Sequence, residues 1–156
     1  VDCLYVNYPG TAITGYMRQM LGKSFVVAQY PKGGQARRPC HVLVASRSDL
    51  GEVSDPWLHA RQLAGDQLEW LVLTEGKAGA VAIHGEEQIR VAARPVSVVD
   101  TTGAGDAFAG GLIHGLARGM AIQDALQCAV DWGAFAVASE SSIPSTALKN
   151  WLKQPH

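Results

Sequence analysis

The sequence predicts an α/β fold with a largely parallel sheet flanked by helices, and two observations favour it. Short apolar runs alternate with helical segments along the 156-residue chain, a pattern typical of strands and helices packed in layers. Hydrophobic residues make up 47% of the chain and charged residues 17%, a balance that excludes an intrinsically disordered protein. The length predicts a single domain over residues 1–156.

The first half of the chain is expected to alternate strands with helices. The ranges, in chain order, are strand 4–8, a helix that follows Thr11 and runs to residue 21, strand 24–28, strand 41–45, helix 56–63 and strand 70–74. Thr11 is expected to cap the first helix, and residues 46–49 are expected to form a polar turn. Residues 30–39 are expected to form a loop with a solvated basic face, or alternatively a phosphate-binding one. The basic side chains of this loop are Lys32, Arg37 and Arg38.

The second half is expected to begin with a β-hairpin and to end in helices. Two short apolar runs, 79–84 and 88–92, are separated by Gly85, which favours a hairpin turn. Helices are then expected at residues 107–118, 122–138 and 144–152. The middle helix places apolar residues three and four positions apart, which predicts one face packed closely on a neighbour.

Net charge and cysteine content limit which partners and which cellular compartment are expected. The formal net charge is -1, so we expect neither nucleic acid nor a membrane surface as a partner. No apolar run approaches the roughly 18 residues of a membrane-spanning helix. The three cysteines are widely spaced, which favours reduced thiols in a cytoplasmic protein. The N-terminus lacks both Met and a basic segment, so the chain is expected to be cut from something longer.

Glycines cluster first at Thr74–Gly79, directly after a predicted strand. Gly76 and Gly79 tolerate positive φ and carry no Cβ, so backbone amides there can approach an anionic or flat ligand. A plain turn into the hairpin needs glycines equally, and that interpretation stays open. The segment is not a Walker A loop, because no Gly-Lys-Ser/Thr sequence closes it.

The second cluster is Thr102–Asp106, which leads into a predicted helix. A glycine-rich turn before a helix exposes unpaired amides at the positive end of the helix dipole, which suits a phosphate. A Rossmann fingerprint is disfavoured because Phe108 stands where its third glycine belongs. Asp106 can cap the helix or serve as the base in phosphoryl transfer, and the residues alone leave both roles open.

The run Asp100–Gly111, which reads DTTGAGDAFAGG, resembles the second signature of the PfkB, or ribokinase-like, carbohydrate kinases. Thr74–Gly79 resembles the Thr-x-Gly-x-x-Gly nucleotide loop of the same family. The resemblance is strongest from Trp70 to Leu152. It implies a ribokinase-like fold that lacks the family's N-terminal half and lid, because the chain has no Gly-Gly-Asn sugar motif.

The resemblance also implies a role for each matching position. Asp106 would be the catalytic base, and the amides of Gly103, Ala104 and Gly105 would join its own in an anion hole. ATP would lie across Thr74, Glu75, Gly76, Lys77, Ala78 and Gly79, with its adenine against Val96, Val98, Val130 and Ala134. A monovalent cation such as K⁺ would lie near Asp100, Thr102, Ala136, Ser139, Ser141 and Ser145. Mg²⁺ would arrive with the nucleotide.

The sequence departs from the family pattern at three of these positions. The family's Asn-x-x-Glu motif falls at Ser46–Asp49, where Asp49 keeps a shortened carboxylate for the metal. Val130 replaces a residue that is often polar near adenine, and Ser141 replaces a glycine of the cation loop.

The expected function is therefore ATP-dependent phosphorylation of a carbohydrate hydroxyl, incomplete in this chain alone. The alternatives are a non-catalytic nucleotide-binding module, or a truncated remnant that acts through protein interaction. A homo-oligomer or a separate N-terminal half is expected to cover the sheet edge left by the missing strands.

Overall fold

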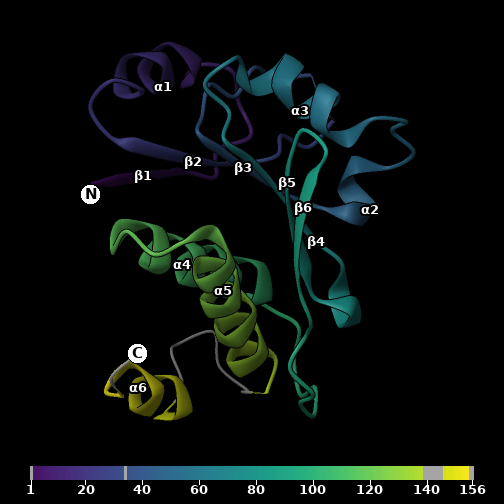
Figure 1. Ribbon diagram of the computed structural model, residues 1–156, viewed down its shortest axis with the longest axis vertical. Coiled ribbons are helices and arrows are strands. Elements are labelled where there is room, and N and C mark those ends of the chain that lie inside the picture. Colours follow the sequence, from purple (N-terminus) through teal and green to yellow (C-terminus); the bar gives the residue numbers. More distant parts are fainter. Residues whose placement is uncertain (1, 34, 139–145, 155–156) are drawn as a thin grey trace. The chain divides into compact units, whose positions relative to one another are not determined.

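The computed structural model describes residues 2–33, 35–138 and 146–154, which form two compact units (Figure 1). The first unit comprises Val1–Gly76 and Ala80–Arg90, and the second comprises Lys77–Gly79 and Val91–His156. The predicted single domain over residues 1–156 stays a prediction. Among the described residues, none of the helices has the length and apolar character that crossing a membrane requires.

The sheet of the first unit has six strands, and their order across the sheet follows the order of the chain. They are β1 (Cys3–Val6), β2 (Phe25–Gln29), β3 (Val42–Ser46), β4 (Trp70–Thr74), β5 (Ala80–His84) and β6 (Glu87–Val91). Strands β1 to β4 are parallel, and β5 runs antiparallel to β4. The expected α/β fold with a largely parallel sheet and a β-hairpin is confirmed, and each strand lies within two residues of its predicted range.

Three helices of the first unit share a core with one face of the sheet. Alternate residues of β2 to β5 bury their side chains in this core together with Met17, Leu50 and Leu63, which belong to α1 (Thr14–Met20), α2 (Arg47–Leu50) and α3 (Pro56–Ala64). Because side chains along a strand alternate between faces, these residues define one face of the sheet.

Two local predictions in this unit are wrong. Helix α1 begins at Thr14 rather than after Thr11, because the carbonyl of Thr11 accepts the Thr14 amide in a turn and Ile13 takes the N-cap position. The expected polar turn at residues 46–49 is the one-turn helix α2. Its N-cap is Ser46, whose Oγ accepts a hydrogen bond from the Asp49 amide at 3.0 Å.

The basic loop at residues 30–39 also differs from expectation at Arg38, whose side chain is fully buried. Its guanidinium donates to the carbonyls of Tyr8 at 2.7 Å and Arg37 at 3.1 Å. Arg38 therefore belongs neither to a solvated face nor to a phosphate site. It links the loop to the segment after β1, because buried cationic groups need hydrogen-bond acceptors.

The second unit is built on α4 (Ala104–Ala117) and α5 (Ile122–Val137), with α6 (Thr146–Leu152) following. A Cβ on Gly111 would lie 2.6 Å from the Cys128 carbonyl oxygen, and one on Gly115 would lie 2.6 Å from the Ala125 Cα. The contacts run in opposite directions along the two helices, so α4 and α5 are antiparallel and packed at backbone distance. This confirms the close packing predicted for the 122–138 helix.

Helix ends in this unit follow their sequence signals with small shifts. Gly119 has φ 72°, and the Met120 amide donates to the Gly115 carbonyl, which together form a Schellman motif that ends α4 as expected. Helix α4 begins three residues earlier than predicted, at Ala104. Helix α6 is described from Thr146, and the predicted start at residue 144 lies outside the described residues.

Candidate active site

The glycine turn before α4 is shaped by hydrogen bonds to its own backbone. Gly103 is the N-cap residue and adopts the left-handed conformation, with φ 77° and ψ 3°, which an L side chain would resist. The Thr102 amide donates to the Asp100 carboxylate at 2.8 Å, and the Ala104 amide donates to the Thr101 carbonyl at 3.2 Å. Hydrogen bonds from Thr102 lower the pKa of Asp100, so this carboxylate stays ionised.

The first turn of α4 presents the groups that an anion requires. Gly105 and Asp106 are exposed, and a Cβ on Gly105 would meet none of the described atoms within 4 Å. The first amides of a helix have no carbonyl partners within the helix, and its dipole places partial positive charge there. Asp106 is the acidic residue of this turn. The turn thus places a carboxylate beside the first amides of the helix, and its role as an anion hole with a catalytic base stays a prediction.

The segment that precedes this turn is held against the C-terminal end of α5. The amides of Val99 and Asp100 both donate to the Val137 carbonyl, at 2.7 and 3.2 Å. Asp100 therefore lies close to the residue that follows Ala136, and these two predicted cation-site positions share one region. Ser139, Ser141 and Ser145, which complete the predicted cation site, lie outside the described residues.

The four positions predicted to contact adenine differ in their exposure. Val96 and Val98 lie in the irregular segment before Asp100, where Val98 is 56% exposed and Val96 is half-buried. Val130 and Ala134 are buried one turn apart on α5, so they lie on one face of that helix. Their assignment to the adenine stays a prediction.

The nucleotide-loop candidate, Thr74–Gly79, follows β4 directly. Thr74 ends β4, and residues 76–78 form a short 3₁₀ turn. Gly76 has φ 55°, and a Cβ there would meet none of the described atoms within 4 Å. Gly79 has φ 100°, and its Cβ would lie 2.0 Å from the Val91 carbonyl oxygen. Gly79 is therefore required by the fold itself, whereas Gly76 leaves space beside the backbone that suits a ligand.

Glu75, within this loop, forms two ion pairs that sequence reasoning did not anticipate. Its carboxylate oxygens lie 2.5 Å from Arg47 Nη2 and 2.9 Å from Arg90 Nη1. The hydrogen bond from Arg47 is the largest of the effects that lower the pKa of Glu75, and the charge of Arg90 adds to it. The partners stand 28 and 15 residues away in sequence, and only the pairing of strands brings them together.

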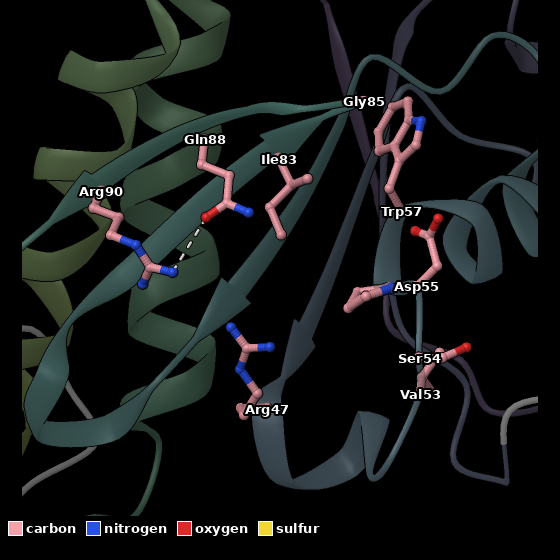
Figure 2. A pocket seen from close by; sticks show the side chains of 10 residues that line it. Arg47, Val53, Ser54, Asp55, Trp57, Ile83, Gly85, Gln88 and Arg90 are labelled. Carbon is pink, nitrogen blue, oxygen red and sulfur yellow. Dashed lines mark hydrogen bonds between the residues drawn. The ribbon is translucent and has the colours of Figure 1, made fainter.

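Both arginines also line a pocket with a volume of ≈ 370 Å³ in the first unit (Figure 2). Asp55 at the N-cap of α3 and Trp57 in its first turn form another part of the lining, and the β5–β6 hairpin contributes Ile83 and Gln88. Arg90 donates to the Gln88 side chain at 3.3 Å, as the dashed line in Figure 2 shows. The guanidinium groups that hold Glu75 are thus open to solvent.

Asp49, the predicted metal residue, lies in the single turn of α2 and is exposed. Burial raises the pKa of the Tyr30 hydroxyl, and the nearby Asp49 carboxylate raises it further. Within residues 2–33, 35–138 and 146–154, no three His, Cys, Asp or Glu side chains converge as a ready metal site. An isolated carboxylate suits Mg²⁺ that arrives with nucleotide phosphates, because this ion usually takes few protein ligands.

Residues 36–149 match the pfkB family of carbohydrate kinases. The match covers well over half of the chain, and the chain belongs to this family.

Relatives with similar sequences are sugar kinases. A fructokinase from Salmonella thompson is 42% identical over 83 residues, which cover 49% of this chain and 38% of that protein. A deoxyribokinase from Salmonella typhi is 36% identical over 89 residues, covering 55% of this chain and 29% of that protein. The chain matches less than two thirds of the length of these relatives.

Solved structures of similar fold are kinases of the same kind. The ribokinase from Thermotoga maritima gives a TM-score of 0.78 at 18% identity, over 98% of this chain and 57% of that one. A fructokinase double mutant from Vibrio cholerae O395, solved with fructose, ADP and potassium bound, gives 0.69 at 25% identity, over 97% and 60%.

Proposed function

We propose that this chain is the nucleotide-binding portion of an ATP-dependent carbohydrate kinase of the ribokinase type. The observation that carries the proposal is the left-handed Gly103 at the N-cap of α4, which precedes an exposed Asp106 in the first turn. Family membership supports the same chemistry.

In the proposed reaction, a sugar hydroxyl oxygen attacks the γ-phosphorus of ATP. The Asp106 carboxylate accepts the hydroxyl proton, the bond between the γ-phosphorus and the β–γ bridging oxygen breaks, and ADP leaves with that electron pair. The amides of Gly103, Gly105 and Asp106 would donate to the transferring phosphoryl group, and the Ala104 amide would exchange its hydrogen bond to the Thr101 carbonyl for one to this group. Donors that are already oriented stabilise the transition state most, because they need not reorganise.

The proposed ligands of this reaction are ATP, Mg²⁺ and a monovalent cation. Residues 74–79 would contact ATP, and Val96, Val98, Val130 and Ala134 would contact its adenine. Asp49 would help to hold Mg²⁺ on the nucleotide phosphates. Potassium would bind oxygen atoms at Asp100, Thr102, Ala136, Ser139, Ser141 and Ser145. Carboxylate, hydroxyl and carbonyl oxygens are the donors that hard cations prefer.

A second candidate is a nucleotide-binding module without catalysis. The matched region covers less than two thirds of each relative, and this observation favours the second candidate for the chain on its own. Self-association, or pairing with a separate N-terminal half, would then supply what the chain lacks. Either would use the outer edge of β1, because an edge strand carries unpaired amides and carbonyls.

The test compares Asp106→Asn with the wild-type chain. Thermal shift with ATP measures binding, and coupled ADP release with fructose, ribose and deoxyribose measures turnover. We expect Asp106→Asn to lower turnover by about 10²–10⁴-fold while the ATP-induced shift persists. Asp124→Asn, which removes the first-turn acid of α5 instead, is the matched control and should keep full activity.

The outcomes separate the candidates. Equal activity of Asp106→Asn and wild type refutes the assignment of the base. A thermal shift with ATP but no ADP release with any sugar favours the non-catalytic module. No shift at millimolar ATP overturns both candidates, because a ligand that binds only the folded state must stabilise it.

A further inference from the structure

The nucleotide loop carries an acidic side chain, Glu75, at a position where negative charge disfavours phosphate. Its side chain is only 16% exposed, and each of its carboxylate oxygens accepts a charged hydrogen bond from a different arginine. The resemblance placed Glu75 among the ATP contacts. A carboxylate that is bound on both oxygens by protein cations has a structural role and is unavailable to a ligand.

We propose that Glu75 is a positioning residue. Its ion pairs with Arg47 and Arg90, which together we call the ionic bracket, hold Glu75 in place, so that the loop 74–79 keeps its nucleotide-binding conformation. This inference rests on the proposed function of that loop. It assigns to all three side chains a role in nucleotide affinity that involves no contact with the nucleotide.

The bracket joins elements from both sides of β4. Thr74 pairs with Ser46 of β3 on one side and with Ala80 of β5 on the other. Arg47 directly follows Ser46, and Arg90 lies on β6, the strand beyond β5. Glu75 thus directly follows β4 and is tied to the strands on both sides of it. The chain immediately after it is Gly76, whose backbone would otherwise be the most freely rotating of the loop.

The exposure of the arginines sets the size of the expected effect. The Arg47 and Arg90 side chains are 46% and 57% exposed, so water screens each pair and a single exposed pair is worth little. Two cations on one mostly covered carboxylate form a small network. Loss of the bracket should weaken ATP binding about three- to ten-fold.

The pocket beside the bracket predicts a dependence on salt. Arg47 and Arg90 line it (Figure 2), so small anions from solvent reach both guanidinium groups. Such anions compete with Glu75 and screen it. The ATP affinity of the wild-type chain should therefore fall more steeply with ionic strength than the ATP affinity of Glu75→Gln, because the variant has no carboxylate whose ion pairs salt can weaken.

The experiment is a double-mutant cycle between Arg47→Met and Glu75→Gln, with ATP affinity measured by titration calorimetry and stability by urea denaturation. We expect each single variant to weaken ATP binding about three- to ten-fold and the double variant to be no weaker than Glu75→Gln. Arg61→Met removes another arginine ion pair of the first unit, with Asp66. It is the matched control and should leave ATP affinity unchanged.

Two results would overturn the positioning role. If Arg47→Met weakens ATP binding equally in the wild-type chain and in Glu75→Gln, the arginine contacts the nucleotide itself. If Glu75→Gln lowers the free energy of unfolding but keeps the ATP affinity of the wild-type chain and its dependence on salt, the role of Glu75 is purely structural. Absence of ATP binding by the wild-type chain is a different result, because it removes the proposed function and this inference with it.

Discussion

Replacing Gly111 by alanine tests the close packing of α4 on α5. Alanine forms helices better than glycine by about 1 kcal/mol, so an isolated helix would gain from the substitution. In this structure the new Cβ would lie 2.6 Å from the Cys128 carbonyl oxygen and 2.8 Å from the Ala129 Cα. Both are backbone atoms, so no rotamer change relieves the clash and the helices must separate.

The distances set the expected magnitude. Restoring an ordinary contact of 3.4 Å from 2.6 Å requires a displacement of roughly 0.8 Å between two backbones. Overpacking of this kind costs about 1–3 kcal/mol, which outweighs the gain in helix propensity. We expect Gly111→Ala to lower the free energy of unfolding by up to about 2 kcal/mol, which is up to about 8 °C in Tm.

The matched control is Gly133→Ala on α5. Its Cβ would lie 3.7 Å from the Ala104 carbonyl oxygen and 3.8 Å from the Phe108 Cβ, which are ordinary contacts. This variant should gain up to about 1 kcal/mol from helix propensity alone. Urea denaturation followed by helical circular dichroism measures both variants. If Gly111→Ala is as stable as Gly133→Ala, α4 and α5 are not packed at backbone distance and the reasoning fails.

The remaining predictions concern a histidine and a helix cap in the first unit. Burial lowers the pKa of His41, whose neutral Nδ1 accepts a hydrogen bond from the Val26 amide at 2.9 Å. The imidazole of the unfolded chain therefore takes up a proton at a higher pH than that of the folded chain. The free energy of unfolding should fall as pH drops below about 6.5. Urea denaturation between pH 8 and pH 5 measures this loss, and an unchanged slope in His41→Gln would contradict it. Asp55 accepts the Leu58 amide at 2.9 Å as the N-cap of α3, so Asp55→Ala should cost about 0.5–2 kcal/mol. Asp55→Asn, measured in the same denaturation assay, should keep most of that stability, and equal losses in both variants would argue against the cap.

Local sequence patterns predicted the secondary structure well where an apolar run or a single glycine fixes the start or the end of an element. Strand β4 was placed without error, because its apolar run ends at a glycine-rich turn. Gly119 marked the end of α4, since a left-handed residue stops a helix. The one-turn helix α2 was missed, because residues 46–49 are all polar and show no periodicity. The Ser46 cap and the burial of Leu50 in the core hold this helix.

The candidate site was found only in part from sequence. The turn at Gly103–Asp106 is local, and both its left-handed conformation and its exposed carboxylate follow from four consecutive residues. Arg38 was assigned to a solvated face because nothing near it in sequence offers burial. Its acceptor on Tyr8 is 30 residues away.

By itself, the sequence determined the alternation of strands and helices, the kinase signature and the glycine turn before α4, because each depends on neighbouring residues. Only the tertiary structure decided which long-range partners meet. Glu75 lies between two arginines, and Gly111 against the backbone of α5, because strand order and helix packing bring distant segments together. Contacts of this kind arise from burying apolar surface over the whole chain, and no local pattern encodes them.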